Sequence, residues 1–536
     1  MKKLKLVCVA IAMAGAAPTF AGGLLTNTNQ HVAFNRMMSR EASIGIDGVY
    51  YNPAGVVFMG EGHHLAINWQ LAYQTRTINN DYKLFTNNVN NPITPRDFKG
   101  KAFAPVIPSF QYAYNKGKWS FQANFSLTGG GGKCTFDDGL GSFEKIVSET
   151  AIAACGLAGV VDQTLGNKLG QQGMEMFTSD QAFGKTGKYS FNSYMHGRQY
   201  YYGLSAGAAY KFCDNFSAFL GVRGVYALTN YYGYVENINV GNMPLYKVLD
   251  PTKENAANIE LSCDQTGVGF TPIIGVDYKT GRWNFSAKYE FKTRIRLKNK
   301  SVNQTPSIGN LPANLANQMT GILTARYQQA GLPLEQAKQQ AENTTNAVLN
   351  DPTVGATMMG LKTQFDQKLN KAIGEYEDGK KIAGDIPAYL ALGIGYSPVD
   401  AVRVNVGFHW FDDKNATSYN NRNKELKRGT LEYNAGVEVD VNKKITLSTG
   451  WQNTNYGLSD EYMDDKSFVV GSNSAAIGGV YHINKKMDLN VAYFHTFYQH
   501  KKTSETVQLA ADKSIVYNSD YTRNNNVFAV GLDINF

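Results

Sequence analysis

The amino-acid sequence predicts an all-β protein, a 14-stranded antiparallel transmembrane β-barrel with an N-terminal plug (hatch) and helical extracellular loops. Three observations predict this fold. Apolar and polar residues alternate in about fourteen segments, short and long connections alternate between those segments, and the 536-residue chain is rich in aromatic residues (12%) but poor in charged ones (18%). Alternation with a period of two gives a strand one apolar and one polar face.

Residues 1–21 are predicted to be a secretory signal and not part of the barrel. Three lysines precede an apolar run at residues 6–16, and a small-residue cleavage site ends at Ala21. Beyond this run there is no stretch of about 20 apolar residues, which excludes a bundle of transmembrane helices. A signal in front of a barrel predicts a multi-pass protein of the outer membrane of a Gram-negative bacterium.

Residues 22–62 follow the signal and lack the alternation of a barrel strand. The segment is fairly apolar, with Phe34, Met37, Met38 and Phe58 among its residues, so water is an unfavourable environment for it. We therefore expect these residues to lie inside the barrel as a plug.

The predicted barrel occupies residues 63–536. Fourteen strands enclose a lumen too wide to fill with side chains, so the apolar faces are expected to meet lipid. An even number of strands, with tight turns at one end and long loops at the other, places both termini in the periplasm. The predicted strands lie near residues 63–77, 103–115, 118–129, 199–212, 215–229, 265–279, 282–298, 386–397, 400–412, 426–441, 444–457, 468–482, 486–499 and 522–536.

Two long loops, near residues 130–198 and 299–385, carry helical periodicity. Apolar residues recur every three or four positions within 144–170 and 311–378. An amphipathic helix needs an apolar partner. Either these helices pack only on one another, or a crevice between them receives a hydrophobic ligand.

Four consecutive glycines, Gly129, Gly130, Gly131 and Gly132, end the predicted third strand. Glycine weakens ladder pairing and tolerates bulges. The run is therefore either a break in the barrel wall or a flexible exit into the loop that follows.

In the strand predicted at 282–298, the even positions from Asn284 to Lys298 are expected to face the lumen, and they carry five cations and one acid. Lys288 and Lys292 fall within the membrane-level lumen, Arg294 lies nearer the outer end, and Arg223 on the fifth strand is a further lumenal cation. One or two such cations suit a carboxylate. These four residues are candidate ligands of a head group, with solvated lumenal charge as the alternative.

Four cysteines remain once the signal is removed, and they allow three disulfide pairings. An exported chain permits disulfides. Cys134–Cys155 is the shortest closure and the pairing we expect first.

Patterns that match catalytic or metal sites fail on their context. Residues 203–207 match a nucleophile elbow but lie within an alternating strand, where the motif needs a strand–turn–helix. His63 and His64 have no matching ligand cluster, so no metal is expected. The net charge of +8 comes from scattered Lys and Arg offset by 44 acids, so no nucleic acid partner is expected. The chain is predicted to have no enzymatic activity and no cofactor.

The stretch Tyr-Asn-Pro-Ala-Gly at 51–55, between a signal and the first strand, resembles the FadL-type family. These proteins are outer-membrane transporters of long-chain fatty acids and other hydrophobic compounds. The fourteen strands, the helical loops and the C-terminal Phe536 agree with the resemblance. It implies that Asn52, Pro53, Ala54 and Gly55 belong to a hatch that blocks the lumen. It also implies a hydrophobic capture groove between the loops and a side exit into the bilayer at a break in the third strand.

The resemblance further implies passive, hatch-gated uptake of long-chain fatty acids or similar hydrophobic molecules. Its expected partners are such a ligand, outer-membrane lipid and lipopolysaccharide, and the barrel-assembly machinery through Phe536. The family tends to use a basic residue near a segment resembling Val225–Ala227, but Leu228 follows here, so that head-group contact is not carried over. The alternative is a surface-binding protein of the outer membrane, an adhesin or phage receptor, that uses its long loops.

Overall fold

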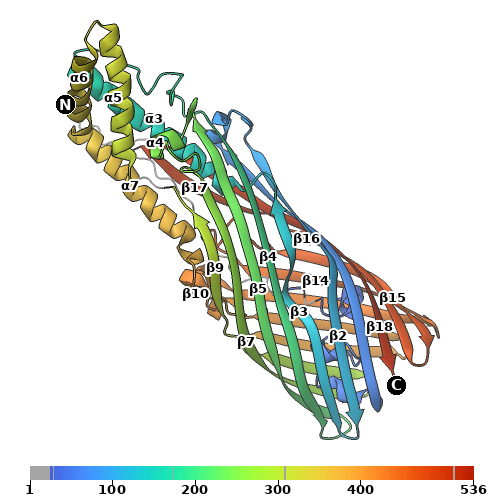
Figure 1. Cartoon of the computed structure of the whole chain (residues 1–536). Coiled ribbons are helices and arrows are strands. Elements are labelled where there is room, and N and C mark those ends of the chain that lie inside the picture. The colour runs from blue at the N-terminus through green and yellow to red at the C-terminus, as the bar shows by residue number, and fades with distance from the viewer. Residues whose placement is uncertain (1–24, 28, 172, 307–308, 511–512) are drawn as a thin grey trace.

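The chain folds into a closed antiparallel barrel of fourteen strands, as predicted (Figure 1). The computed structural model describes residues 25–536 except 28, 172, 307–308 and 511–512, so the predicted signal at 1–21 lies outside the described residues. The barrel closes where β1 (Gly62–Tyr82) pairs with β18 (Lys513–Asn535), from His64 opposite Asn535 to Tyr82 opposite Tyr517.

The other strands follow one another around the wall, each paired with its neighbours in the chain. Three of the fourteen are interrupted and consist of two pieces, while the two-residue β6 (Met243–Pro244) only extends the end of β5. The uninterrupted strands are β2 (Arg96–Lys116), β3 (Trp119–Phe136), β4 (Tyr189–Lys211), β5 (Phe216–Val240), β7 (Ile259–Thr280), β12 (Val402–Phe411), β13 (Arg428–Asn442), β14 (Ile445–Gly457) and β15 (Ser472–Asn484). The interrupted ones are β8 (Trp283–Glu290) with β9 (Arg296–Gln304), β10 (Lys381–Ala383) with β11 (Tyr389–Val399), and β16 (Met487–Tyr498) with β17 (Lys501–Ala510).

Alternate residues of each strand face outward and inward. On β1, Trp69 is 37% exposed on the outer face, whereas the neighbouring Gln70 is 0% exposed inside the barrel. The outer surface as a whole carries exposed Phe, Tyr, Trp, Val, Ile and Leu side chains, and the buried inward positions are largely polar. This distribution suits a lipid-facing exterior, as the alternation predicts.

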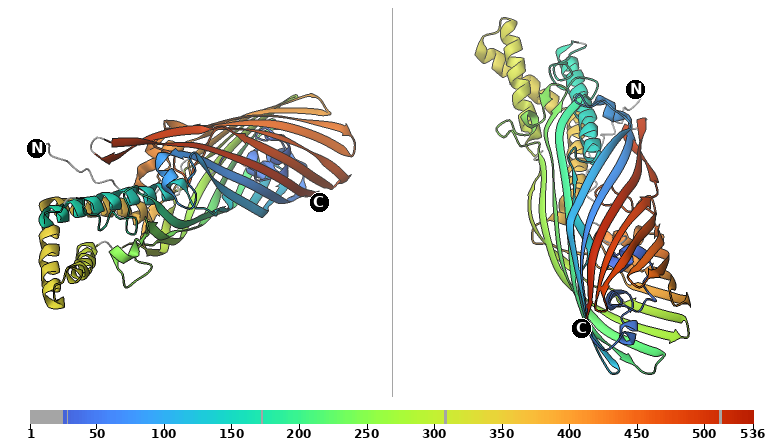
Figure 2. Two further views of the ribbon diagram at one scale, coloured as in Figure 1. Left: turned by 90° about the horizontal axis from the view of Figure 1, so that it is seen from above. Right: turned by 90° about the vertical axis from the view of Figure 1, so that its right-hand side faces the viewer.

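Tight turns join the strands at the end of the barrel that carries the C-terminus. Gly117 (φ 59°) and Gly281 (φ 55°) adopt left-handed backbone conformations in two of these turns, which glycine adopts without a steric cost. The helices gather at the opposite end (Figures 1 and 2). They are α3 (Gly141–Leu169), α4 (Tyr246–Leu249), α5 (Leu311–Gln329), α6 (Leu334–Leu349) and α7 (Pro352–Ile373).

The wall is much taller on one side than on the other. Strand β5 has 25 residues and β4 has 23, whereas β12 has only 10. Helix α3 lies against the upper part of the tall side and packs on β4 and β5. The α5–α6 hairpin extends beyond it, away from the barrel (Figure 1).

Residues 25–61, which we call the N-terminal segment, lie within the barrel. The segment contains α1 (Val32–Met37), α2 (Gly48–Tyr51) and a 3-10 turn, η1 (Gly55–Phe58), and every residue of the two α-helices is buried. Glycines on the inner wall make room for it. A Cβ on Gly393 would lie 2.7 Å from the Ala42 nitrogen, and one on Gly436 or Gly450 would overlap the Met37 carbonyl. Glycine is therefore used where two backbones approach closely.

Candidate functional site

Asn52 attaches the N-terminal segment to strand β7. Its Nδ2 donates to Asp277 Oδ2 (2.6 Å), and its Oδ1 accepts from the Gly55 backbone nitrogen (3.2 Å). A Cβ on Gly55 would overlap the Asn52 amide, so this turn requires glycine at 55. The side chain of Asn52 thus closes the turn and bonds to the wall at the same time.

The two residues between them bond to nearby strands of the same side of the wall through their carbonyls. The Pro53 oxygen accepts from Gln122 Nε2 on β3 (2.7 Å), and the Ala54 oxygen accepts from Ser217 Oγ on β5 (2.7 Å). All four residues of the predicted motif therefore lie in one turn packed against the inner wall.

A buried group of charges holds the middle of the N-terminal segment. Nη1 of Arg36 and Nη1 of Arg40 both lie close to Glu438 Oε1, at 2.6 and 2.9 Å, and Arg40 also contacts Asp47 through two hydrogen bonds of 2.7 and 3.0 Å. Charges taken out of water are costly unless they are paired. Both guanidinium groups here have a carboxylate partner, so the cost of burying their charge is offset. Through these ion pairs the segment is bound to the wall at β13.

Two of the predicted head-group residues, Arg223 and Lys288, face the lumen but are engaged within the protein. Arg223 forms a bidentate pair with Glu290 (2.6 and 2.9 Å), and Lys288 donates to Glu290 Oε1 (2.9 Å) and to the Tyr50 carbonyl (2.7 Å). Both cations also stand over the Tyr50 ring, at 5.2 and 4.4 Å. Through these contacts the two cations hold the N-terminal segment. Their charged groups are therefore already bonded within the protein and are not available to a ligand.

The prediction that every even position of 282–298 faces the lumen is wrong beyond Glu290. Positions 284, 288 and 290 are buried inside, but after the interruption between β8 and β9 it is Thr293, Ile295 and Leu297 that are buried. A slip of one residue exchanges the two faces of a strand. Arg294 is consequently exposed on the outer face, and Lys292 is half-buried and donates to the Asn415 carbonyl (3.1 Å).

The glycine run at 129–132 lies within the wall, because β3 continues to Phe136 and does not end near residue 129 as predicted. Ladder pairing between β2 and β3 stops after Ser109–Ser126 and resumes at Ala102–Cys134, which leaves residues 103–108 and 127–133 unpaired with each other. Pairing of β3 with β4 continues there, with two bulges. We call this interruption the β2–β3 gap.

The composition of both strands accounts for the gap. Pro105 and Pro108 on β2 have no N–H to donate across it. On β3, Gly130 (φ 79°) and Gly132 (φ 154°) adopt backbone angles outside the strand range, which shift the register.

A cavity of about 240 Å³ lies in the upper lumen, above the N-terminal segment. Residues on both sides of the β2–β3 gap line it, including Ala102, Ala104 and Ile107 on β2 and Leu127 and Gly130 on β3. We call it the lumenal cavity. The gap and the cavity are therefore adjacent.

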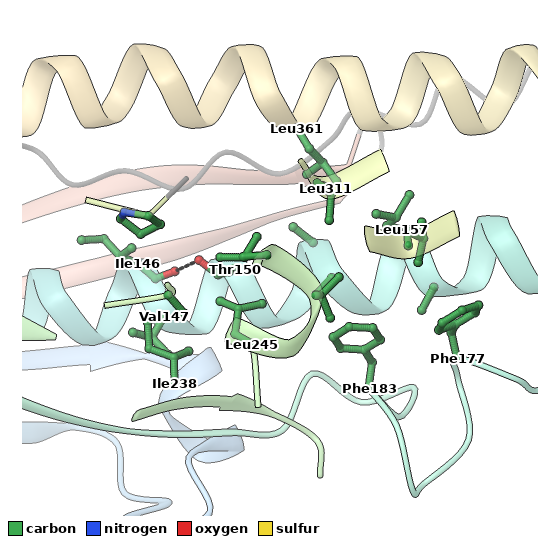
Figure 3. A pocket seen from close by; sticks show the side chains of 18 of the residues that line it. Ile146, Val147, Thr150, Leu157, Phe177, Phe183, Ile238, Leu245, Leu311 and Leu361 are labelled. Atoms are coloured by element: carbon green, nitrogen blue, oxygen red, sulfur yellow. Dashed lines mark hydrogen bonds between the residues drawn. The ribbon is translucent and has the colours of Figure 1, made fainter. Parts of the chain in front are cut away.

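A second, apolar cavity of about 110 Å³ lies among the helices at the mouth of the barrel (Figure 3). We call it the mouth pocket. Its walls come from several elements far apart in the sequence, with Leu157 on α3, Ile238 on β5, Leu311 on α5 and Leu361 on α7. The loop residues Phe177, Phe183 and Leu245 complete it. The helices predicted at 144–170 and 311–378 thus do meet around an apolar space.

A buried acid lies in the loop between α7 and β10. Both carboxylate oxygens of Glu375 are buried and have no hydrogen-bond partner, and the side chain is 1% exposed. Burial raises the pKa of Glu375 to about 8, although Lys466 and Arg422 nearby oppose the rise. A buried acid with a raised pKa predicts that these loops respond to pH.

The expected disulfide is not formed, since the four cysteines among the described residues are free thiols. Cys134 lines the lumenal cavity on β3, whereas Cys155 on α3 donates to the Phe183 carbonyl (3.3 Å) beside the mouth pocket. The two thiols therefore lie in different parts of the molecule. No group of three or more metal-ligating side chains occurs among the residues that the structure describes.

Two cations of the lumenal cavity, Arg76 on β1 and Arg523 on β18, were not among the predicted site residues. The inward parity of β1, which places Gln70, Gln74 and Arg76 on one face, would have identified the first of them. Their position opposite each other depends on the closure of the barrel, which no local pattern carries.

No protein-family model and no curated protein sequence matches the chain. Solved structures do. A FadL homologue from Pseudomonas aeruginosa aligns with 96% of this chain and 100% of its own, with a TM-score of 0.56 at 14% identity. A deletion mutant of the monoaromatic hydrocarbon channel TodX aligns with 95% of this chain and 100% of its own, with a TM-score of 0.50 at 13% identity.

The alignments include the whole of both similar structures, so the similarity extends over the entire fold. Identities of this size establish the fold alone. The chain has the fold of the FadL-type channels, as its sequence predicts.

Proposed function

We propose that this chain is an outer-membrane channel for the passive uptake of hydrophobic molecules, in which the N-terminal segment is the hatch. The fold it shares with a FadL homologue and with a hydrocarbon channel supports this class of function. Long-chain fatty acids are the first substrates to test.

The β2–β3 gap beside the lumenal cavity is the observation that carries the proposal. The N-terminal segment fills the lower lumen with buried side chains and is bonded to β3, β5 and β7, so the axial path below the cavity is blocked. The gap faces sideways, at residues 103–108 and 127–133. A hydrophobic molecule in the cavity then has a lateral exit into the hydrocarbon of the bilayer, which such a molecule prefers to water.

The mouth pocket is the proposed capture site. Nearly all of its lining side chains are apolar, contributed by α3, α5, α7 and the loops around them. Pockets that bind small molecules are typically concave and apolar in this way. A ligand would pass from the mouth pocket to the lumenal cavity and leave through the gap, down its own gradient of affinity and without an energy source.

Uptake of a labelled long-chain fatty acid by cells that lack their own transporter tests this proposal directly. We expect cells producing the chain to accumulate the label faster than cells carrying an empty vector, and a labelled monoaromatic hydrocarbon serves as a second substrate. No uptake of either compound, from a barrel shown to be in the outer membrane, would contradict the proposal and favour an adhesin or phage receptor.

A further inference from the structure

The shift of one residue after Glu290 turns a row of cations toward the outside of the barrel. On β8 the odd positions face outward, with Trp283 and Phe285 exposed. On β9 the even positions are exposed, while Leu297 and Asn299 between them are buried. Lys381 on β10 is exposed beside them. We call these outward-facing side chains the outer-face patch, which consists of Arg294, Arg296, Lys298, Lys300 and Lys381.

The outer-face patch lies at the upper edge of an apolar belt on β7. The exposed side chains of that belt are Val268, Phe270, Ile274, Val276 and Tyr278. At about 3.3 Å per residue and a tilt of about 40°, the interval from Tyr278 to Val268 rises about 25 Å, the height of the lipid-facing band of such barrels. Lys298 pairs with Thr266, two residues beyond Val268. The patch therefore stands at the level of the head groups of the outer leaflet.

The charges of the patch are largely uncompensated within the protein. Lys298 and Lys381 are register partners, and like charges placed directly opposite on neighbouring strands destabilise the pair. Arg296 is paired with Asp385 (3.0 Å), but none of the other four cations forms an ion pair with a residue that the structure describes. The arrangement is thus unfavourable for folding unless an anion from outside the chain binds there.

An acid on the neighbouring strand does not neutralise the patch. Asp264 on β7 is the register partner of Lys300, yet its Oδ1 accepts from Asn230 Nδ2 on β5 (2.8 Å). With one acid facing five cations, the surface keeps a net positive charge at the boundary between hydrocarbon and water.

We propose that the outer-face patch binds the phosphate groups of lipopolysaccharide, whose acyl chains lie on the apolar belt beneath it. Lys and Arg form strong, charge-assisted hydrogen bonds with phosphate oxygens, and clusters of them attract anionic lipid head groups. Arg294 and Lys300 are about 20 Å apart along the strand, which is long enough for two phosphate groups of one head group. This lipid site lies outside the barrel and is independent of the proposed uptake function.

Displacement of a fluorescently labelled lipopolysaccharide from the purified chain, refolded in a nonionic detergent, tests the assignment. The competitors are bisphosphorylated lipid A and its monophosphorylated form, which has the same acyl chains. We expect the wild type to bind the bisphosphorylated lipid at least about tenfold more tightly, which corresponds to about 1.4 kcal/mol. The affinity should also fall as salt screens the charges.

A quadruple glutamine variant removes the cations that have no ion pair and leaves Arg296 with Asp385. We expect this variant to bind lipid A at least about tenfold more weakly than the wild type and to lose the preference for the second phosphate. Its substitutions are Arg294→Gln, Lys298→Gln, Lys300→Gln and Lys381→Gln.

The matched control removes four exposed lysines from two tight turns at the opposite end of the barrel. It changes the net charge by the same amount and is expected to leave both affinities unchanged. Its substitutions are Lys443→Gln, Lys444→Gln, Lys485→Gln and Lys486→Gln. The heat-dependent gel mobility of the barrel shows whether each variant has folded. A further variant, Lys298→Arg/Lys300→Arg/Lys381→Arg, keeps the charges and should retain the binding of the wild type.

Four results would overturn the inference. The first is an unchanged affinity of the folded quadruple variant for lipid A, and the second is an equal loss in the control, which would reflect net charge alone. The third is displacement by phosphatidylglycerol as effective as that by lipid A, which would assign the patch to any anionic phospholipid. The fourth is displacement by inorganic phosphate at millimolar concentration, which would indicate a site for the free ion. A chain that binds lipid A but takes up no hydrophobic compound would refute the proposed function and leave this lipid site standing.

Discussion

Single residues of the inner wall determine how closely the N-terminal segment approaches the barrel. Gly436 and Gly450 leave no room for a side chain, because the backbone of Met37 occupies the space where a Cβ would lie. The obstacle is backbone, so rotation of a neighbouring side chain cannot relieve it. Either the N-terminal segment or the strand must move when a larger residue is introduced.

Gly450→Ala is therefore expected to displace the hatch and to make the lumen leaky. Cells producing this variant should become severalfold more sensitive to a hydrophilic antibiotic that the outer membrane normally excludes. Gly321→Ala in α5 is the control, since a Cβ there meets nothing within 4 Å. Equal sensitivity of the two strains would contradict the role of the N-terminal segment as a barrier.

Glu375 makes the loop before β10 sensitive to pH. Its pKa is raised to about 8 in the folded chain by burial, from an ordinary value near 4.5, so the folded state binds the proton more tightly than the unfolded state does. Stability of the loop is then greatest below the ordinary pKa and declines as pH rises from about 4.5 to about 8. Glu375→Gln should remove this decline.

The rate of proteolytic cleavage within residues 374–384 measures the effect, at pH 6 and at pH 9. We expect the ratio of the two rates to be larger for the wild type than for Glu375→Gln. The exposed Glu377 of the same loop provides the control Glu377→Gln, which corrects for the pH dependence of the protease. Identical ratios in all three proteins would show that Glu375 does not titrate in this range.

At the scale of elements, the β2–β3 gap and the helices of the mouth pocket are the features that distinguish this chain from a uniform barrel. The gap arises from proline on one strand and glycine on the other, and each residue type disrupts a different part of the ladder. The strand pair is otherwise regular, with pairing from Ser109–Ser126 to Lys116–Trp119 below the gap.

A disulfide across the gap is expected to block the exit reversibly. A Cβ placed on Gly132 would lie 3.6 Å from the Cβ of Ala104, within the range that a disulfide requires. The variant Ala104→Cys/Gly132→Cys, made with Cys134→Ser, should take up little labelled fatty acid when oxidised and should recover on reduction. Because the φ of Gly132 strains any other residue, the reduced form of the same variant is the reference. Equal uptake in both forms would exclude the gap as the exit.

For the whole molecule, the strand number, the closure of the wall and the helical loops were predictable, because periodicity is a local property. Residues 402–411, for example, alternate strictly and form β12. Which residues of 291–298 face the lumen was not predictable, since the composition of the strand does not show a shift of one residue after Glu290. The pairing of Arg76 with Arg523 across the closing strands was also not predictable, because the two residues are 447 positions apart in the chain and meet only when the barrel closes.

The attachment of the N-terminal segment depends on charges that belong to distant parts of the chain. Glu438→Gln removes the carboxylate that Arg36 and Arg40 share, and breaking a buried ion pair typically costs about 3–5 kcal/mol. Limited proteolysis of the purified barrel should then cleave residues 25–61 several times faster than in the wild type. Glu505→Gln, which removes a largely exposed partner of Lys145, should leave that rate unchanged. Protection of the hatch in Glu438→Gln would mean that the hydrogen bonds of the Asn52 turn suffice to hold it.

The unequal height of the wall has a consequence for where the protein first meets its ligand. At about 3.3 Å per residue and a tilt of about 40°, the 25 residues of β5 rise roughly twice the thickness of a hydrocarbon layer of about 30 Å, whereas the 10 residues of β12 rise only about 25 Å. The tall side therefore extends well beyond the membrane surface. In the uptake that we propose, this height would place the mouth pocket beyond the hydrated sugars of lipopolysaccharide, so a hydrophobic ligand would be captured outside that layer and released into the lipid beneath it.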